Sequence, residues 1–238
     1  MPRTRIARNI EREVTYSDEH WRVLAAKRRK GVYILKFLSR YGFKPFIFGS
    51  VARGDIHKKS DIEIIVLDSK ALPYIELLLL SNFGLEEKTI IMATPRTAIK
   101  VYFHIDPELT VVVPAVPLSY DEYEFYKFGG KIELPEAENP RNRVPGVNKN
   151  LCLILPTERG HMEFSIIGRE HEVSRILGVR ISIVNERKHM LLRRDQLGRT
   201  GVYLELHLDP NESTMRKLME LRDTDPAIRR LYREREAN

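Results

Sequence analysis

Asp61 and Glu63, two carboxylates separated by one residue, are the side chains of this sequence best suited to chemistry. They lie in the run Ser60-Asp61-Ile62-Glu63-Ile64-Ile65-Val66, whose alternation predicts a strand with both acids on one face and the isoleucines in the core. Shortly before it, Phe48-Gly49-Ser50 predicts a tight turn that can hold phosphate. Two oxygen ligands near such a turn would suit a magnesium–nucleotide complex.

The residues around the turn are candidates for nucleotide binding. Gly49 has no Cβ, so its backbone could approach phosphate closely, and Ser50 with the N–H groups after it could donate hydrogen bonds. Arg53, Lys58 and Lys59 could add further phosphate contacts, with Arg53 best placed because it lies one turn after Ser50. The alternative interpretation is an ordinary turn followed by an edge strand with a solvated acidic face.

Hydrophobic periodicity predicts the elements that must position these residues. Helices are expected over 17–40 and 72–83, and strands over 46–48, 61–67, 99–105 and 110–116, the last two forming a hairpin. This order predicts an α+β fold, with helices flanking a mixed sheet. We expect this domain to cover residues 1–132, followed by a linker or long loop over 133–150 and a smaller C-terminal α+β domain over 151–238.

The C-terminal segment contains a pattern over residues 172–192 that resembles a DNA-binding helix–turn–helix. Gly178 would make the turn, and the small Ser174 would face it. Basic side chains in and after the second helix could contact nucleic-acid phosphates: Arg187, Lys188, Arg193 and Arg194. Two short helices joined by glycine are also common in α+β domains without any such role.

The segment Phe48-Gly49-Ser50 … Asp61-Ile62-Glu63-Ile64 resembles the signature of the DNA polymerase β-like nucleotidyltransferase superfamily. More loosely, the whole chain is similar to a family of uncharacterised archaeal predicted nucleotidyltransferases. The resemblance implies transfer of a nucleotidyl group from a nucleoside triphosphate, with ATP the expected donor, to an acceptor hydroxyl. It implies that Asp61 and Glu63 hold one or two Mg²⁺ or Mn²⁺ ions in a two-metal mechanism.

The same resemblance implies a third acid on a later strand, which would join the metal site and activate the acceptor hydroxyl. Asp106 is the expected residue, because it is the only acid on the strand face that it shares with Tyr102 and His104. Pro107 follows at once, so Asp106 could instead cap a turn, and Glu108 is then the alternative.

Composition sets looser bounds on the function. The 238 residues include 40 Lys and Arg against 33 Asp and Glu, a formal net charge of +7, which favours anionic partners such as nucleotides, RNA or DNA. Cys152 is the only cysteine, which excludes intrachain disulfides and cysteine-cluster metal sites. No apolar signal segment follows the basic N-terminus, so we expect a cytoplasmic protein without a membrane partner.

Two other classes of function fit the sequence. The protein could be a catalytically inactive regulator that senses nucleotide and binds nucleic acid, or a subunit that binds a partner protein. A third carboxylate close to Asp61 and Glu63 would favour the enzyme. A continuous basic surface on the second helix of 172–192 would favour the regulator, and a large exposed apolar patch around 72–80 would favour the partner-binding subunit.

Overall fold

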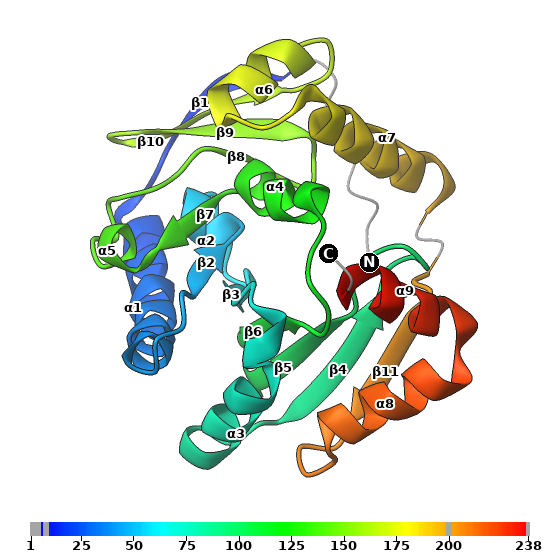
Figure 1. Ribbon diagram of the computed structural model, residues 1–238. Helices are drawn as coiled ribbons and strands as arrows, with labels where there is room; N and C mark the ends of the chain where they lie inside the picture. Colours follow the sequence, from blue (N-terminus) through cyan, green and yellow to red (C-terminus); the bar gives the residue numbers. More distant parts are fainter. Residues whose placement is uncertain (1–5, 7–9, 199–200, 237–238) are drawn as a thin grey trace. The chain divides into compact units, whose positions relative to one another are not determined.

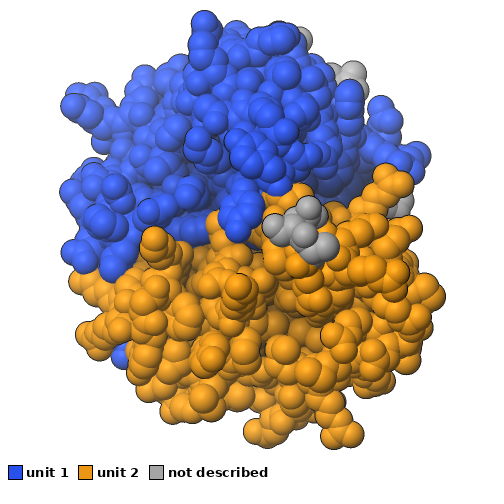
Figure 2. Space-filling model, in the orientation of Figure 1, with its two compact units in different colours: residues 1–33, 46–60, 120–200 blue, residues 34–45, 61–119, 201–238 orange. Residues whose placement is uncertain are grey.

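The computed structural model describes residues 6, 10–198 and 201–236. The chain forms two compact units, each assembled from three separate segments and coloured in Figure 2. Unit 1 comprises residues 1–33, 46–60 and 120–200, and unit 2 comprises 34–45, 61–119 and 201–238. The units are thus interleaved along the chain, whereas the sequence led us to expect consecutive domains. The predicted α+β class is confirmed, because both units combine helices with sheets.

Unit 2 contains a mixed sheet (Figure 1). Its own strands follow the order β11 (Leu204–Leu208), β4 (Glu87–Met92), β5 (Lys100–Asp106), β6 (Leu109–Pro114) and β3 (Ile62–Ile65). β3 runs parallel to β6, and the other neighbours are antiparallel. The expected hairpin is confirmed as β5 and β6. Ile62 of β3, Val101 of β5 and Val111 of β6 are fully buried in the core of this sheet.

Within the described residues, the α-helices that lie wholly in unit 2 are α3 (Leu72–Asn82), α8 (Thr214–Thr224) and α9 (Pro226–Glu236). Side chains cap the starts of the last two. Ser213 accepts the N–H of Arg216 at 3.3 Å, and Asp225 Oδ1 accepts the N–H groups of Ala227 and Ile228 at 2.8 and 3.1 Å. These caps explain why the helices begin where they do.

A buried ion pair connects three elements of unit 2. The Lys88 side chain on β4 is fully buried, and its Nζ lies 2.6 Å from Glu76 Oε1 on α3. Thr214, the first residue of α8, donates its hydroxyl to the same carboxylate oxygen at 2.5 Å. The pair therefore fixes the start of α8 against α3 and β4, although these elements are far apart in the sequence.

Unit 1 contains an antiparallel sheet in the order β1 (Glu11–Thr15), β10 (Gly160–Ser165), β9 (Cys152–Thr157) and β8 (Gly146–Val147). A second antiparallel pair joins β2 (Phe46–Phe48) to β7 (Lys131–Glu133). Gly160 is required where β10 meets β1, because a Cβ there would lie 1.8 Å from the carbonyl oxygen of Val14.

The helices of unit 1 are α2 (Ser50–Arg53), α4 (Tyr120–Gly129), α5 (Leu134–Ala137), α6 (Glu170–Leu177) and α7 (Ile181–Leu197). α1 (Asp18–Arg40) contributes residues to both units. α6, α7 and β9 share one apolar core that includes Leu153, Val173 and Val184. α5 and β8 lie within 133–150, so the segment expected as a linker carries structure of its own in unit 1.

In the part of the chain that the structure describes, no helix is both long and apolar enough to cross a lipid bilayer.

Candidate active site

Asp61 and Glu63 lie at the start of β3 in unit 2. Asp61 directly precedes the strand and is exposed, and Glu63 lies within it and is half-buried. Ile62 and Ile64 are fully buried. This pattern agrees with the expected alternation, in which the two acids share one face of the sheet and the isoleucines pack on the other.

The pairing of β3 with β6 brings the turn after β5 beside these acids. The N–H of Ile62 donates to the carbonyl of Glu108 at 2.6 Å. Leu109 lies opposite Ile62 in β3 and opposite Asp106 in β5. The backbones of the predicted acid Asp106 and of the alternative, Glu108, are therefore close to the start of β3, as a third acid in the site would require.

Asp106 also has a structural role in this turn. Its Oδ1 accepts the N–H of Glu108 at 2.9 Å, the turn-capping contact that the following proline suggested. The register shifts between His104 and Asp106, which marks a bulge at the end of β5. Asp106 thus holds the shape of the turn, and a function in the site remains a prediction.

His104, for which no role was predicted, lies in line with Glu63 across the intervening strand β6. Thr110 is opposite Glu63 in β3 and opposite His104 in β5. Nδ1 of His104 is 3.1 Å from the Thr110 hydroxyl, and Nε2 is 3.0 Å from the Thr89 hydroxyl. Burial lowers the pKa of His104 below its ordinary value, which favours the neutral ring.

The donor chemistry of the acids suits a magnesium ion that is shared with a nucleotide. Mg²⁺ commonly uses one or two carboxylates and takes its remaining oxygens from phosphates and water. Asp61 and Glu63, on one face, meet that requirement. Among residues 6, 10–198 and 201–236, no group of three His, Cys, Asp or Glu side chains could hold a metal ion. An ion here would therefore depend on phosphate oxygens for its other ligands.

The predicted turn at Gly49 lies in unit 1, between β2 and α2. Gly49 has φ 79° and ψ −142°, a conformation that glycine adopts readily and other residues rarely do. Its N–H donates to the carbonyl of Gly130 at 2.9 Å, and its own carbonyl accepts the N–H groups of Ala52 and Arg53. Ser50 begins α2, so the strand turns into the helix where the sequence predicted.

Arg28 of α1 holds this turn in place, which nothing in the sequence indicated. Its side chain is buried, with Nε 2.7 Å from the Val51 carbonyl and Nη2 3.0 and 2.9 Å from those of Ala52 and Asn142. Burial lowers its pKa to about 10. Arg28 therefore fixes the end of α2 against the loop at Asn142.

The three predicted basic phosphate contacts differ in their surroundings. Arg53 is buried, with Nε 3.0 Å from Asp55 Oδ1 and Nη1 2.5 Å from the Gly129 carbonyl. Lys58 is exposed, and its Nζ lies 2.9 Å from Oε1 of Glu19. The hydrogen bond that Lys58 donates to this carboxylate raises the pKa of Lys58. Lys59 is exposed as well. Only the two lysines present their charge to solvent.

The predicted nucleic-acid contacts also divide into two classes. α6 and α7 are joined at Gly178, which has a left-handed φ of 59°. The Arg187 guanidinium lies over the Phe125 ring, 4.2 Å from its centroid, and burial lowers its pKa to about 10. Lys188 Nζ is 2.5 Å from Glu170 Oε1. Arg193 and Arg194 are exposed and could meet phosphates.

No protein-family model matches the chain, and no curated protein matches its sequence.

Proposed function

We propose that this protein is a Mg²⁺-dependent nucleotidyltransferase, which moves a nucleotidyl group from a nucleoside triphosphate, with ATP the expected donor, to an acceptor hydroxyl. The observation that carries the proposal is the grouping of acids around the start of β3. Asp61 and Glu63 share a face of the sheet, and the backbone of Glu108 is hydrogen-bonded to Ile62 between them. This arrangement supports the roles that the sequence signature implies.

In this proposal Asp61 and Glu63 hold the metal, and Asp106 is the third acid, with Glu108 the alternative. A bound Mg²⁺ or Mn²⁺ would neutralise the charge that develops at the α-phosphorus. The Gly49–Ser50 turn, Lys58 and Lys59 would contact the phosphates. We leave Arg53 out of the phosphate contacts, because its guanidinium is buried and engaged by Asp55 and Gly129.

The distribution of charged residues between the two units supports an anionic partner for unit 1. Unit 2 contains slightly more acidic than basic residues, so the positive excess of the chain belongs to unit 1. Arg193 and Arg194, exposed on α7, are the contacts that we propose for RNA or DNA, while Arg187 and Lys188 are held inside unit 1.

The direct test is transfer of label from α-labelled nucleoside triphosphates, with Mg²⁺ or Mn²⁺, to cellular RNA, protein and metabolite pools. We expect label in one pool, and loss of about a hundredfold or more in Asp61→Asn. Glu220→Gln is the matched control, because Glu220 is an exposed acid on α8. Equal transfer by wild type and Asp61→Asn would contradict the proposal.

One observation favours a second candidate, a subunit that binds a partner protein. Tyr74 and Leu77 on α3 are each 64% exposed, although both are large apolar side chains. They lie three residues apart on the outer face of a helix whose inner residues, Ile75 and Leu79, are buried. Loss of a co-purifying partner in Leu77→Lys, with transfer activity absent throughout, would favour this candidate.

A further inference from the structure

Three arginines of unit 1 gather where α1 meets the loop after α5. Arg141 and Arg143 of this loop lie over the ring of Trp21 on α1, with their Cζ atoms 4.0 and 4.7 Å from its centroid. Arg28, about two turns further along α1, reaches the same loop, because its Nη2 donates to the carbonyl of Asn142 at 2.9 Å. The neutral ring of Trp21 thus has two guanidinium groups against it and a third nearby.

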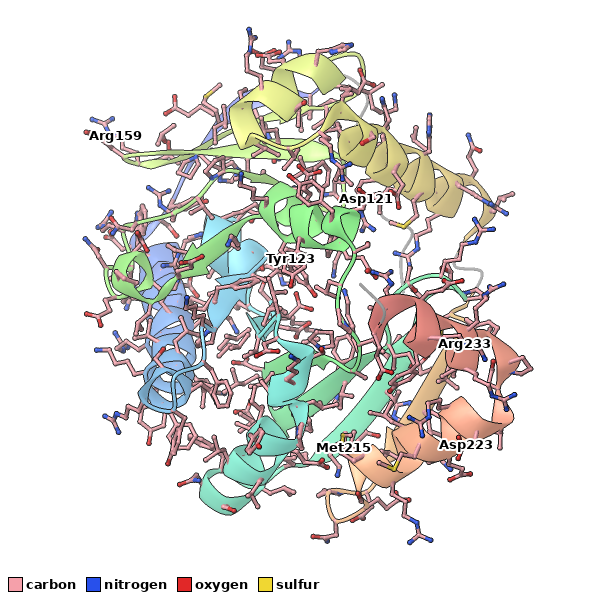
Figure 3. The ribbon with its side chains drawn as sticks, in the orientation of Figure 1. Asp121, Tyr123, Arg159, Met215, Asp223 and Arg233 are labelled. Atoms are coloured by element: carbon pink, nitrogen blue, oxygen red, sulfur yellow. The ribbon has the colours of Figure 1, made fainter. Side chains whose placement is uncertain are left out.

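Backbone carbonyls accept the hydrogen bonds of the two less exposed arginines. Arg28 donates to carbonyls around α2, and Arg143 donates to those of Thr157, at 2.6 Å, and Gly160. Figure 3 labels Arg159 in the turn between these last two residues. Carbonyls satisfy the donors but carry no net charge. Among the residues that the structure describes, no carboxylate lies within ion-pair distance of any of the three arginines.

The three positive charges repel one another. Burial and the charge of Arg143 lower the pKa of Arg28 to about 10. Burial also lowers the pKa of Arg143, and the charge of Arg141 adds to that effect. Asp55, which follows α2, does not neutralise them, because Arg53 holds its carboxylate through Nε and Nη2 at 3.0 and 3.1 Å. An anion bound here would therefore relieve a repulsion that the chain itself leaves in place.

The arginines can reach a ligand from solvent. Arg141 is exposed, Arg143 and Trp21 are half-buried, and Arg28 is buried behind them. Stacking on the indole uses the face of a guanidinium and leaves the N–H groups in its plane for an anion. The ring also limits the positions that the two outer guanidiniums can take, so less freedom is lost when a ligand binds.

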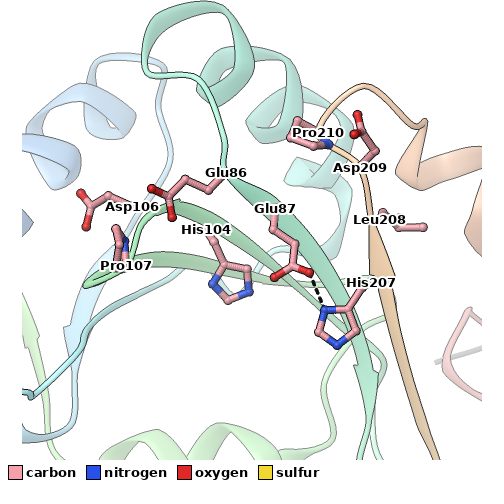
Figure 4. Close-up of a pocket in the computed structure, with 9 residues that line it drawn as sticks. All are labelled: Glu86, Glu87, His104, Asp106, Pro107, His207, Leu208, Asp209 and Pro210. Carbon is pink, nitrogen blue, oxygen red and sulfur yellow. Dashed lines mark hydrogen bonds and ion pairs between the residues drawn. The ribbon is translucent and has the colours of Figure 1, made fainter.

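A phosphate monoester matches this arrangement better than a carboxylate. It carries a charge of about −1.5 to −2 at pH 7 and three terminal oxygens, so it can accept from two guanidinium groups at once. The surface of unit 2 shown in Figure 4 offers a contrast. That hollow is lined by acids that include Glu86, Glu87 and Asp209, and none of the described residues that line it is Lys or Arg. It would repel phosphate.

We propose that Arg141 and Arg143, packed on Trp21 with Arg28 behind them, form a binding site for a phosphate monoester. The site lies within unit 1 and uses none of the residues that we assign to metal, triphosphate or nucleic acid. Its binding is measured without metal and without triphosphate. Failure of this proposal is therefore distinguishable from failure of the proposed transfer.

The test is calorimetric titration of the full chain, free of divalent metal, with ribose 5-phosphate at physiological ionic strength. We expect one saturable site, together with a saturable change in the fluorescence of Trp21, the only tryptophan of the chain. Arg141→Gln should weaken binding about tenfold or more, and Arg141→Lys, which keeps the charge but loses the planar fork, about threefold. Arg175→Gln, at an exposed position of α6, is the matched control and should bind within about twofold of wild type.

Competing ligands identify the group that is recognised. We expect inorganic phosphate to displace ribose 5-phosphate and adenosine to leave it bound. Because Arg141 is exposed, its replacement should leave the fold unchanged, which circular dichroism checks. Equal weakening by Arg141→Gln and Arg175→Gln would show a response to diffuse charge and would overturn the proposal. Absence of saturable binding, displacement by adenosine, or calorimetric binding with unchanged Trp21 fluorescence would overturn it too.

Discussion

Glu63 lies opposite Thr110 where β3 and β6 run in parallel, and the Thr110 hydroxyl is 3.1 Å from Nδ1 of His104 on the next strand. The Thr89 hydroxyl engages the other ring nitrogen of His104 at 3.0 Å. A row of polar side chains thus crosses the sheet of unit 2, starting at a predicted metal ligand. The hydrogen bonds fix the orientation of the ring next to the predicted site.

Replacement of Thr110 by valine should test this row. The change keeps the shape of the side chain but leaves one half-buried histidine nitrogen without its hydroxyl partner. We expect Thr110→Val to lower the free energy of unfolding by about 1 kcal/mol, and Thr110→Ser to retain most of it. Urea unfolding measures both. A valine variant as stable as wild type would show that the contact contributes nothing.

Arg28 should contribute more than Thr110 to the free energy of unfolding, because its buried guanidinium donates hydrogen bonds to several carbonyls around α2. Arg28→Met would leave the carbonyls of Val51, Ala52 and Asn142 without this donor, and we expect a loss of about 3 kcal/mol in unfolding free energy. Arg29→Met is the matched control, because the next residue of α1 is exposed and should change stability by less than about 0.5 kcal/mol. Equal losses in the two variants would contradict the clamping role.

The buried pair of Lys88 and Glu76 predicts a non-additive double-mutant cycle. Lys88→Met leaves the Glu76 carboxylate buried without its counter-ion, so we expect a loss of about 3–5 kcal/mol by chemical denaturation. In the double variant Lys88→Met, Glu76→Met, part of that loss should be recovered, because no uncompensated charge remains. A double variant whose loss equals the sum of the single losses would contradict this account.

His161 should make the stability of the protein depend on pH. Its ring is buried, Nδ1 lies 2.6 Å from the Tyr16 hydroxyl, and burial lowers the pKa of His161 below the ordinary value of 6.5. As pH falls below 6.5, the unfolded chain binds a proton that the folded chain does not. The unfolding free energy should therefore decrease until pH reaches the lower folded pKa.

The check on this prediction is thermal unfolding between pH 7.5 and 5, with His161→Asn beside wild type. The substitution removes the titrating group, so its melting temperature should fall less over that interval than that of the wild type. His189→Asn, at an exposed position of α7, is the control and should follow the wild type. Identical pH profiles for wild type and His161→Asn would refute the assignment.

Local patterns predicted much of the secondary structure. The helix expected over 17–40 corresponds to α1, the strand over 61–67 contains β3, and the predicted hairpin is β5 with β6. These elements depend on hydrophobic periodicity, which neighbouring residues carry. The same reasoning placed the two acids on one strand face and the glycine turn directly after β2.

Sequence patterns did not predict the contacts between distant segments of the chain. Leu204 of β11 lies opposite Met92 of β4, and Glu11 of β1 lies opposite Phe164 of β10, so neither sheet could be assembled from local signals. For the same reason the interleaved units were not predicted. Arg28 was missed because a basic residue on a helix is ordinarily solvated, and only the packed structure shows it to be buried. Arg187 was predicted to contact phosphates, whereas the structure places its guanidinium over the Phe125 ring.

The central claim is that Asp61 and Glu63 support nucleotidyl transfer. The most direct measurement compares metal-dependent incorporation of label from α-labelled ATP by wild type, Glu63→Gln and Glu220→Gln. We predict incorporation by wild type and by Glu220→Gln, and at least about a hundredfold less by Glu63→Gln at an unchanged melting temperature. Equal incorporation by all three proteins, or none by the folded wild type with any acceptor pool and any of the four nucleotides, would contradict it.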